Sequence, residues 1–308
     1  MSLVNRTSSA ALAAAFIAFM VGAPLTSKAQ SAISESTPQV ARSTAAFAVV
    51  RVGHGRPMIL IPGLLSAGEV WNGTVERYRD RFDMHVLTLA GFAGVPPLQT
   101  EKYLEAERDA IIRYIRENRL EKPILLGHSL GAFLAFWVAA TAPELVGPII
   151  AVDGVPYLPS LVDTSMTPAK AMGQAAQFSA MAATFSPEQL GMQMVMVMRA
   201  QSKDSSHAAM GARWGRASDG ATMGRAMAEM LTTDLRAEVA AIRTPVLLIA
   251  SGFDFSEERR KVVLDIYAAQ VSRIPDRRVV MARNARHFVM LDDPQYLYSM
   301  IDEFLSDR

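Results

Sequence analysis

The chain of 308 residues has no cysteine, so its chemistry involves no disulfide bond, thiolate metal ligand or thiol redox centre. The chain also has no large excess of positive or negative charge, because 31 basic and 30 acidic residues leave a formal net charge of +1. This balance gives no electrostatic reason to expect nucleic acid or an anionic membrane as a partner. Since the chain also lacks a His cluster, a P-loop and a G-x-G-x-x-G motif, we expect no metal and no cofactor.

Hydrophobic runs long enough to cross a bilayer are scarce too. The apolar run Ala10–Val21 is short for a membrane span. It follows Arg6 and precedes the small residues around Ala29, which is the pattern of a secretory signal cleaved after Ala29. We therefore predict a signal peptide over 1–29 and an exported protein, periplasmic or secreted, with no stable membrane insertion after cleavage. A retained anchor or a transit peptide is the alternative.

Apolar runs of strand length recur along the rest of the chain and alternate with helical stretches. These runs do not alternate strictly between apolar and polar residues, which is typical of strands buried on both faces of a parallel sheet. Apolar spacing over Tyr103–Asn118 predicts a crossover helix, and Asp293-Pro294 predicts the start of a last helix that ends near Leu305. The predicted strands are 47–52, 58–61, 84–89, 124–126, 148–152, 246–250 and 278–281. The pattern predicts an α/β fold with a mostly parallel central sheet flanked by helices.

The segment Gly127-His128-Ser129-Leu130-Gly131 has the pattern of a nucleophile elbow. An apolar strand-like run precedes it, and the helix-forming stretch Ala132–Ala142 follows it. In such a strand-to-helix turn the flanking glycines permit close backbone packing, and the serine hydroxyl is exposed at the tip. We therefore predict Ser129 as a nucleophile.

A serine hydroxyl becomes reactive only when a base takes its proton and an acid orients that base. His287 is the predicted base, because it follows a strand-like run at 279–281 and comes after Ser129 in chain order. The other histidines are predicted to be structural: His54 in a hairpin turn, His85 in a strand, His128 beside the nucleophile and His207 in a Ser-rich segment.

Two aspartates at strand ends compete for the role of the acid. Asp254 follows the apolar run 245–250, and it is the first choice. Asp153 directly follows the run 148–152 and remains the alternative, because a carboxylate there would also reach the histidine.

An oxyanion hole requires two backbone N–H donors. The amide of Leu130, just after the nucleophile, is predicted as one donor. The loop after the strand at 58–61 is predicted to supply the other from Leu64, with Gly63 letting the substrate approach the backbone. The alternative for this loop is a plain Pro-Gly turn.

Together these motifs resemble a lid-bearing serine hydrolase of the α/β-hydrolase superfamily, over about residues 45 to 305. The resemblance implies that Ser129 is the nucleophile, Asp254 the orienting acid and His287 the general base. Three positions depart from it, since many relatives have histidine where Pro62 stands, glycine where Ser251 stands and a small residue where Arg286 stands. The landmarks are Ile61-Pro62-Gly63-Leu64, Leu89-Ala90-Gly91-Phe92, the elbow, 245–254, Arg286-His287-Phe288 and Asp293-Pro294.

The interval between the strands at 148–152 and 246–250 is too long for one crossover helix. We predict a polar leader over 30–45, a core formed by 46–154 and 241–308, and a helical cap over 155–240. The cap holds 11 of the 18 methionines, and methionine suits an apolar surface that adapts to varied ligands. The predicted substrate-binding residues are Gly63, Met192, Met196 and Phe288. The alternative for the methionines is packing of the cap against the core.

The expected function is hydrolysis of small to medium apolar carboxylic esters through an acyl-enzyme, with a small-molecule apolar ester as the expected partner. Alternatives with the same residues are carbon–carbon bond hydrolysis, lactone or thioester hydrolysis, and perhydrolysis. A non-enzymatic alternative is a ligand-binding receptor on the same fold. The oligomeric state is not predicted.

Overall fold

A computed structural model describes residues 42–43 and 45–306. The predicted signal peptide at 1–29 and most of the predicted leader at 30–45 lie outside these residues, so both remain predictions. Within the described ranges, no helix has the length and apolar character needed to cross a membrane.

All seven predicted strands form, and with a short additional strand they build an eight-stranded sheet in the described part of the chain. The order across the sheet is β1-β2-β4-β3-β5-β6-β7-β8. Strands β3 to β8 run parallel, whereas β1 and β2 are antiparallel to their neighbours. The strands are β1 (Arg42–Ser43), β2 (Phe47–Gly53), β3 (Arg56–Ile61), β4 (Phe82–Leu89), β5 (Ile124–His128), β6 (Ile149–Val152), β7 (Val246–Ser251) and β8 (Arg277–Ala282). The hairpin expected at His54 is absent, because the turn joins β2 to β3 and β2 pairs with β4 instead.

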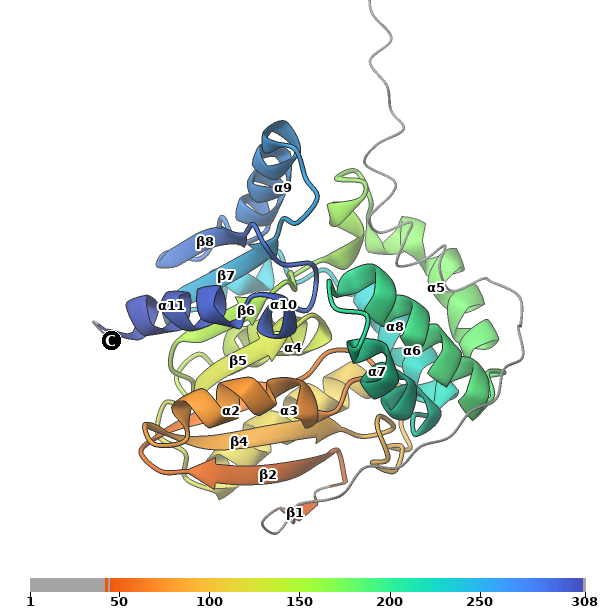
Figure 1. Cartoon of the computed structure of the whole chain (residues 1–308), viewed down its shortest axis with the longest axis horizontal. Helices are drawn as coiled ribbons and strands as arrows, with labels where there is room; N and C mark the ends of the chain where they lie inside the picture. Colours follow the sequence, from red (N-terminus) through yellow and green to blue (C-terminus); the bar gives the residue numbers. More distant parts are fainter. Residues whose placement is uncertain (1–41, 44, 307–308) are drawn as a thin grey trace, which may run out of the picture.

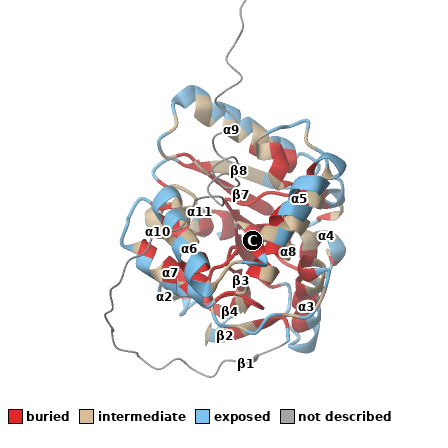
Figure 2. Ribbon diagram, turned by 90° about the vertical axis from the view of Figure 1, so that its right-hand side faces the viewer, coloured by how far each residue is buried: buried red, intermediate tan, exposed pale blue. Residues whose placement is uncertain are grey.

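Helices cover both faces of the sheet, which is why its central strands are buried along their whole length (Figures 1 and 2). Helices α2 and α11 pack together on one face, and α3 and α4 pack together on the other (Figure 1). The core helices are α2 (Asn72–Tyr78), α3 (Tyr103–Glu117), α4 (Leu130–Thr141), α9 (Glu257–Gln270), α10 (Val289–Asp292) and α11 (Pro294–Leu305), and the 3-10 turns are η2 (Gly68–Trp71), η3 (Leu158–Leu161) and η4 (Glu238–Ala241). The predicted helices at 103–118 and before Leu305 are confirmed, and the Asp293 side chain accepts a hydrogen bond from the Tyr296 N–H at the start of α11.

The insertion between β6 and β7 folds into four helices that lie beside the sheet (Figure 1). They are α5 (Pro168–Ala182), α6 (Pro187–Gln201), α7 (His207–Arg216) and α8 (Gly220–Thr232). Ser186 and Gln189 form a capping box that starts α6. Helix α6 packs on α7, and a Cβ at Gly215 would lie only 2.4 Å from the Leu190 carbonyl oxygen. The glycines of α7 therefore serve close helix packing.

Candidate active site

The turn between β5 and α4 holds Ser129 in a conformation that few side chains adopt, with φ 54° and ψ −117°. A Cβ at Gly127 would lie 2.3 Å from the Gly131 carbonyl oxygen, and one at Gly131 would lie 2.2 Å from the Ile61 carbonyl oxygen. The predicted elbow is thus wedged against the end of β3, where only glycine fits on either side of the serine. Strained backbone that its surroundings hold in place is typical of a functional residue.

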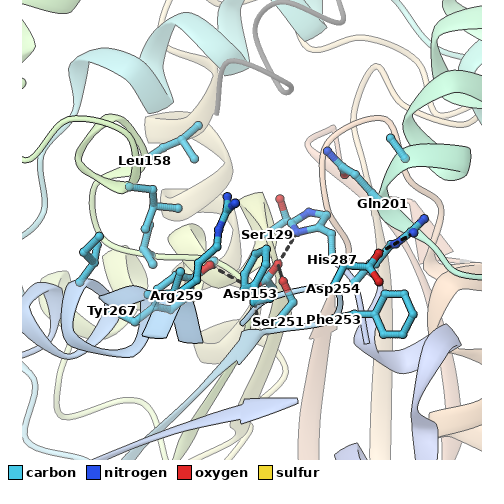
Figure 3. Close-up of a pocket in the computed structure, with 18 of the residues that line it drawn as sticks. Ser129, Asp153, Leu158, Gln201, Ser251, Phe253, Asp254, Arg259, Tyr267 and His287 are labelled. Carbon is cyan, nitrogen blue, oxygen red and sulfur yellow. Dashed lines mark hydrogen bonds and ion pairs between the residues drawn. The ribbon is translucent and has the colours of Figure 1, made fainter. Parts of the chain in front are cut away.

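His287 lies on the loop after β8, and its imidazole contacts a buried carboxylate. Its Nδ1 lies 2.7 Å from Oδ2 of Asp153, at the end of β6 (Figure 3). The carbonyl of Val152 also accepts the Ser129 N–H, at 2.9 Å. Serine, histidine and aspartate are therefore brought to one edge of the sheet by three parallel strands, at the side where ligands bind in such sheets.

The Asp153 carboxylate is held by donors from two other elements. The N–H of Ser251 donates to Oδ1 at 2.8 Å and its hydroxyl to Oδ2 at 2.9 Å, while the Tyr267 hydroxyl donates to Oδ1 at 2.9 Å. Burial acts to raise the pKa of Asp153, but the hydrogen bonds from His287 and Ser251 outweigh it and the pKa is lowered. Burial and the neighbouring carboxylate hold the pKa of Tyr267 well above its ordinary value, so its hydroxyl remains a donor. Asp153 is consequently an ionised acceptor facing His287.

Asp254 was the first choice for this acid, and the structure corrects that prediction. Its carboxylate is 60% exposed and pairs with Nη2 of Arg286 at 2.9 Å. The Arg286 guanidinium also lies over the ring of Phe253, 5.3 Å from its centroid, at the rim of the site. Asp254 is thus drawn outward by the cation next to His287, whereas Nδ1 of the histidine is taken by Asp153. Neither Ser251 nor Tyr267 was predicted to contact the acid, although Ser251 stands where many relatives have glycine.

The backbone amides of Leu64 and Leu130 have no hydrogen-bond acceptor among the residues that the structure describes. Leu64 and Gly63 line a recess of about 20 Å³ that is also lined by Ser129 and His287. A Cβ at Gly63 would lie 3.3 Å from the Ser129 Cβ, so glycine keeps this wall close to the serine. The arrangement fits the predicted oxyanion hole.

His128 and Phe288 form the back wall of the site. The His128 ring lies 4.5 Å from the His287 ring and 4.9 Å from the Phe288 ring, measured between centroids. Its Nε2 lies 3.1 Å from the His287 carbonyl oxygen, which only accepts, so Nε2 carries the proton. Phe288 was predicted to bind substrate, but it is buried and reaches only the small recess, because its ring packs against the two histidines.

The buried imidazole of His128 predicts a pH dependence of stability. Burial, and then the charge of His287, hold the pKa of His128 well below its ordinary value. Below about pH 6.5 the His128 imidazole therefore binds a proton in the unfolded chain but stays neutral in the folded chain. The contribution of the neutral imidazole to stability is thus present above that pH and is lost as the pH falls. We expect His128→Gln to reduce the slope of the free energy of unfolding between pH 6.5 and 5 by about 1.4 kcal/mol per pH unit. Urea unfolding of both proteins across this range measures it, and equal slopes would contradict the assignment.

A cavity of about 980 Å³ extends from Ser129 beneath the cap. Its apolar lining includes Phe133, Val155, Leu158, Leu161, Val197 and Met230. Met192 and Met196 are not part of it: their side chains are 39% and 42% exposed. Helix α6 turns a different stripe toward the cavity, which includes Val197 and Gln201 (Figure 3). The prediction that Met192 and Met196 bind substrate is therefore wrong, since both lie on the outer surface of the cap.

The family model described as alpha/beta hydrolase family matches residues 58–299. The chain is 27% identical over 267 residues to the N-formylmaleamate deformylase of Pseudomonas putida, covering 82% of this chain and 90% of that protein. It is 31% identical over 104 residues to the pimeloyl-[acyl-carrier protein] methyl ester esterase of Aliivibrio salmonicida, a match to 34% of this chain and only 38% of that esterase.

Solved structures share the fold. A thermophilic esterase from Thermogutta terrifontis superposes with a TM-score of 0.69 at 18% identity, covering 85% of this chain and 93% of that one. The enol-lactonase from Burkholderia xenovorans superposes with a TM-score of 0.68 at 14% identity, covering 85% and 99%. At such identities the likeness concerns the fold alone.

Proposed function

Since the chain belongs to the alpha/beta hydrolase family, we propose that it is a serine hydrolase of carboxylic esters with Ser129, His287 and Asp153 as its triad. The observation that carries the proposal is the contact of 2.7 Å between His287 and Asp153 in the cavity that Ser129 also lines. A base oriented by a buried carboxylate beside a strained serine is the arrangement that activates a hydroxyl for acyl transfer.

The mechanism follows from the donors and acceptors in place. His287 takes the Ser129 proton at Nε2 while Asp153 holds the Nδ1–H, and the serine oxygen attacks the ester carbonyl carbon. The amides of Leu64 and Leu130 donate to the oxyanion that forms. His287 then returns the proton to the departing alcohol as the acyl–oxygen bond breaks. Water repeats the cycle on the acyl-enzyme and releases the acid.

The cavity supports an ester with an apolar chain of medium length. Its walls are mostly apolar side chains from the core and the cap, and its volume of about 980 Å³ lies in the range of small-molecule sites. The relatives include an enzyme named as a methyl ester esterase and one named as a deformylase. Ester hydrolysis is therefore proposed ahead of carbon–carbon or thioester cleavage and ahead of a receptor role.

Hydrolysis of p-nitrophenyl esters from acetate to palmitate tests this function. We expect turnover with an optimum at medium chain length, because the cavity limits how much apolar chain is taken from water. Ser129→Ala is the control variant, and it should show no turnover above the spontaneous hydrolysis of the ester. Turnover that survives in Ser129→Ala, or no turnover at any length by the folded wild-type protein, would contradict the proposal.

A further inference from the structure

Two arginines line the cavity, and they differ in how their charge is matched. Arg286 at the mouth is paired with Asp254. Arg259 forms no ion pair with any residue in the described part of the chain. Its neighbour Arg260, outside the cavity lining, is paired with Glu257. The Arg259 guanidinium is therefore a cation without a carboxylate partner, and it lines a cavity whose walls are mostly apolar.

The position of Arg259 is defined by its surroundings. It belongs to the first turn of α9, where its N–H donates to the Ser256 hydroxyl at the helix start. Its side chain is half-buried and extends from α9 toward the cavity (Figure 3). Its Cζ lies 4.5 Å from the centroid of the Phe255 ring, which also lines the cavity. Stacking on an aromatic ring leaves the edge of a guanidinium, with its N–H donors, open to a ligand.

No carboxylate of the cavity wall neutralises this cation. Asp153 is occupied by His287, Ser251 and Tyr267. Glu258 also lines the cavity, but it is exposed and makes no ion pair with Arg259. A planar guanidinium in such a position matches a carboxylate, which it binds with two parallel hydrogen bonds.

We infer that the substrate carries a carboxylate, in its acyl or its alcohol part, that binds Arg259 while the ester group lies at Ser129. This inference rests on the proposed function and narrows its substrate to an apolar ester that ends in a carboxylate. The apolar walls hold the chain between the two groups, and the cation selects the charged end. An uncharged ester of the same length leaves Arg259 without a ligand.

Matched esters test this selection. The p-nitrophenyl half-ester of adipate is compared with p-nitrophenyl hexanoate, and 4-acetoxybutanoate with butyl acetate. For the carboxylate member of at least one pair, we expect Arg259→Ala to lower kcat/KM by about 10- to 100-fold, mainly through KM, because a charged hydrogen-bonded pair is lost. Both neutral esters should change less than about twofold. Arg259→Lys, which keeps the charge but not the fork, should fall between.

Arg283→Ala is the matched control. It removes an equal charge from an exposed arginine that pairs with Glu257 outside the cavity lining, so it reports any change in long-range attraction alone. We expect it to leave all four esters unchanged. An equal loss on charged and neutral esters in Arg259→Ala would overturn the inference, as would no loss on either carboxylate ester.

A binding measurement separates this inference from the proposed function. Calorimetry of adipate with the Ser129→Ala protein should show binding that weakens as the salt concentration rises. The double variant Ser129→Ala/Arg259→Ala should not bind adipate. If esters are not hydrolysed but adipate binds through Arg259, the hydrolase proposal fails and the carboxylate site stands. If esters are hydrolysed but adipate binding does not depend on Arg259, the carboxylate site is refuted and the hydrolase stands.

Discussion

We expect Asp153→Asn to lower kcat for ester hydrolysis by roughly 10⁴-fold, the loss found when an orienting aspartate is replaced by its amide in a serine triad. We expect Asp254→Asn, by contrast, to change kcat by less than about threefold. The reason lies at Nδ1 of His287, which is 2.7 Å from Asp153. An amide nitrogen at this position donates to Nδ1, and the proton moves to Nε2, where it blocks removal of the Ser129 proton.

The comparison requires steady-state kinetics of both variants on the same ester from pH 5 to 9. Ser251→Ala adds a graded control, because it removes one of the donors to Asp153 and leaves the carboxylate in place. We expect its loss of kcat to lie between those of the two aspartate variants. A large loss in Asp254→Asn with near-normal Asp153→Asn would restore Asp254 as the acid.

We expect Gly131→Ala to lower the free energy of unfolding by about 4 kcal/mol or more, the range of the most disruptive single substitutions. An added Cβ would lie 2.2 Å from the Ile61 carbonyl oxygen and 2.7 Å from that of Pro62. Both atoms belong to backbone at the end of β3, so relief requires the elbow to separate from the sheet. Catalytic activity is expected to vanish with the fold, since the Leu64 amide lies in the loop that would be displaced.

Gly173→Ala is the matched control, because it adds the same methyl group inside helix α5 where nothing lies within 4 Å. Alanine is the better helix former, so this variant should gain roughly 0.5 to 1 kcal/mol. Urea unfolding of the two variants and the wild-type protein measures both changes. A Gly131→Ala protein as stable as the wild type would show that the elbow does not need its second glycine.

The strands, the elbow and the position of His287 at the site could be predicted because their signals are local. The central strands are continuous apolar runs that a sheet covered on both faces buries, and the elbow carries its two glycines close to Ser129. His287 was found by chain order and by the strand before it. None of these features depends on which distant side chain meets which.

The acid depends on tertiary contacts, so its assignment could not be settled locally. Asp153 and Asp254 both follow apolar runs, and both have a positive φ. The choice is made by Ser251 and Tyr267, which lie 98 and 114 residues from Asp153 in the sequence. Arg286 also favours Asp153 as the acid, because it pairs with Asp254 and holds that carboxylate away from His287.

The cap methionines show the same limit. Helical periodicity places Met192 and Met196 on one stripe of α6 and Met194 and Met198 on another. The sequence separates these stripes but does not show which one packs against the neighbouring helices. In the structure the second stripe is buried and the first faces outward.

Because Asp153 lies at the end of β6, the loop after β7 does not have to supply the carboxylate that orients His287. In the proposed triad the end of β6 supplies the carboxylate, so Phe253, Phe255 and Arg259 are free to shape selectivity. Randomising positions 253, 255 and 259 would therefore explore new substrates while nucleophile, base and acid stay untouched. The three side chains of the proposed triad thus follow β5, β6 and β8, whereas the side chains proposed to select the substrate come after β7, so that substrate selectivity can change while the triad is kept.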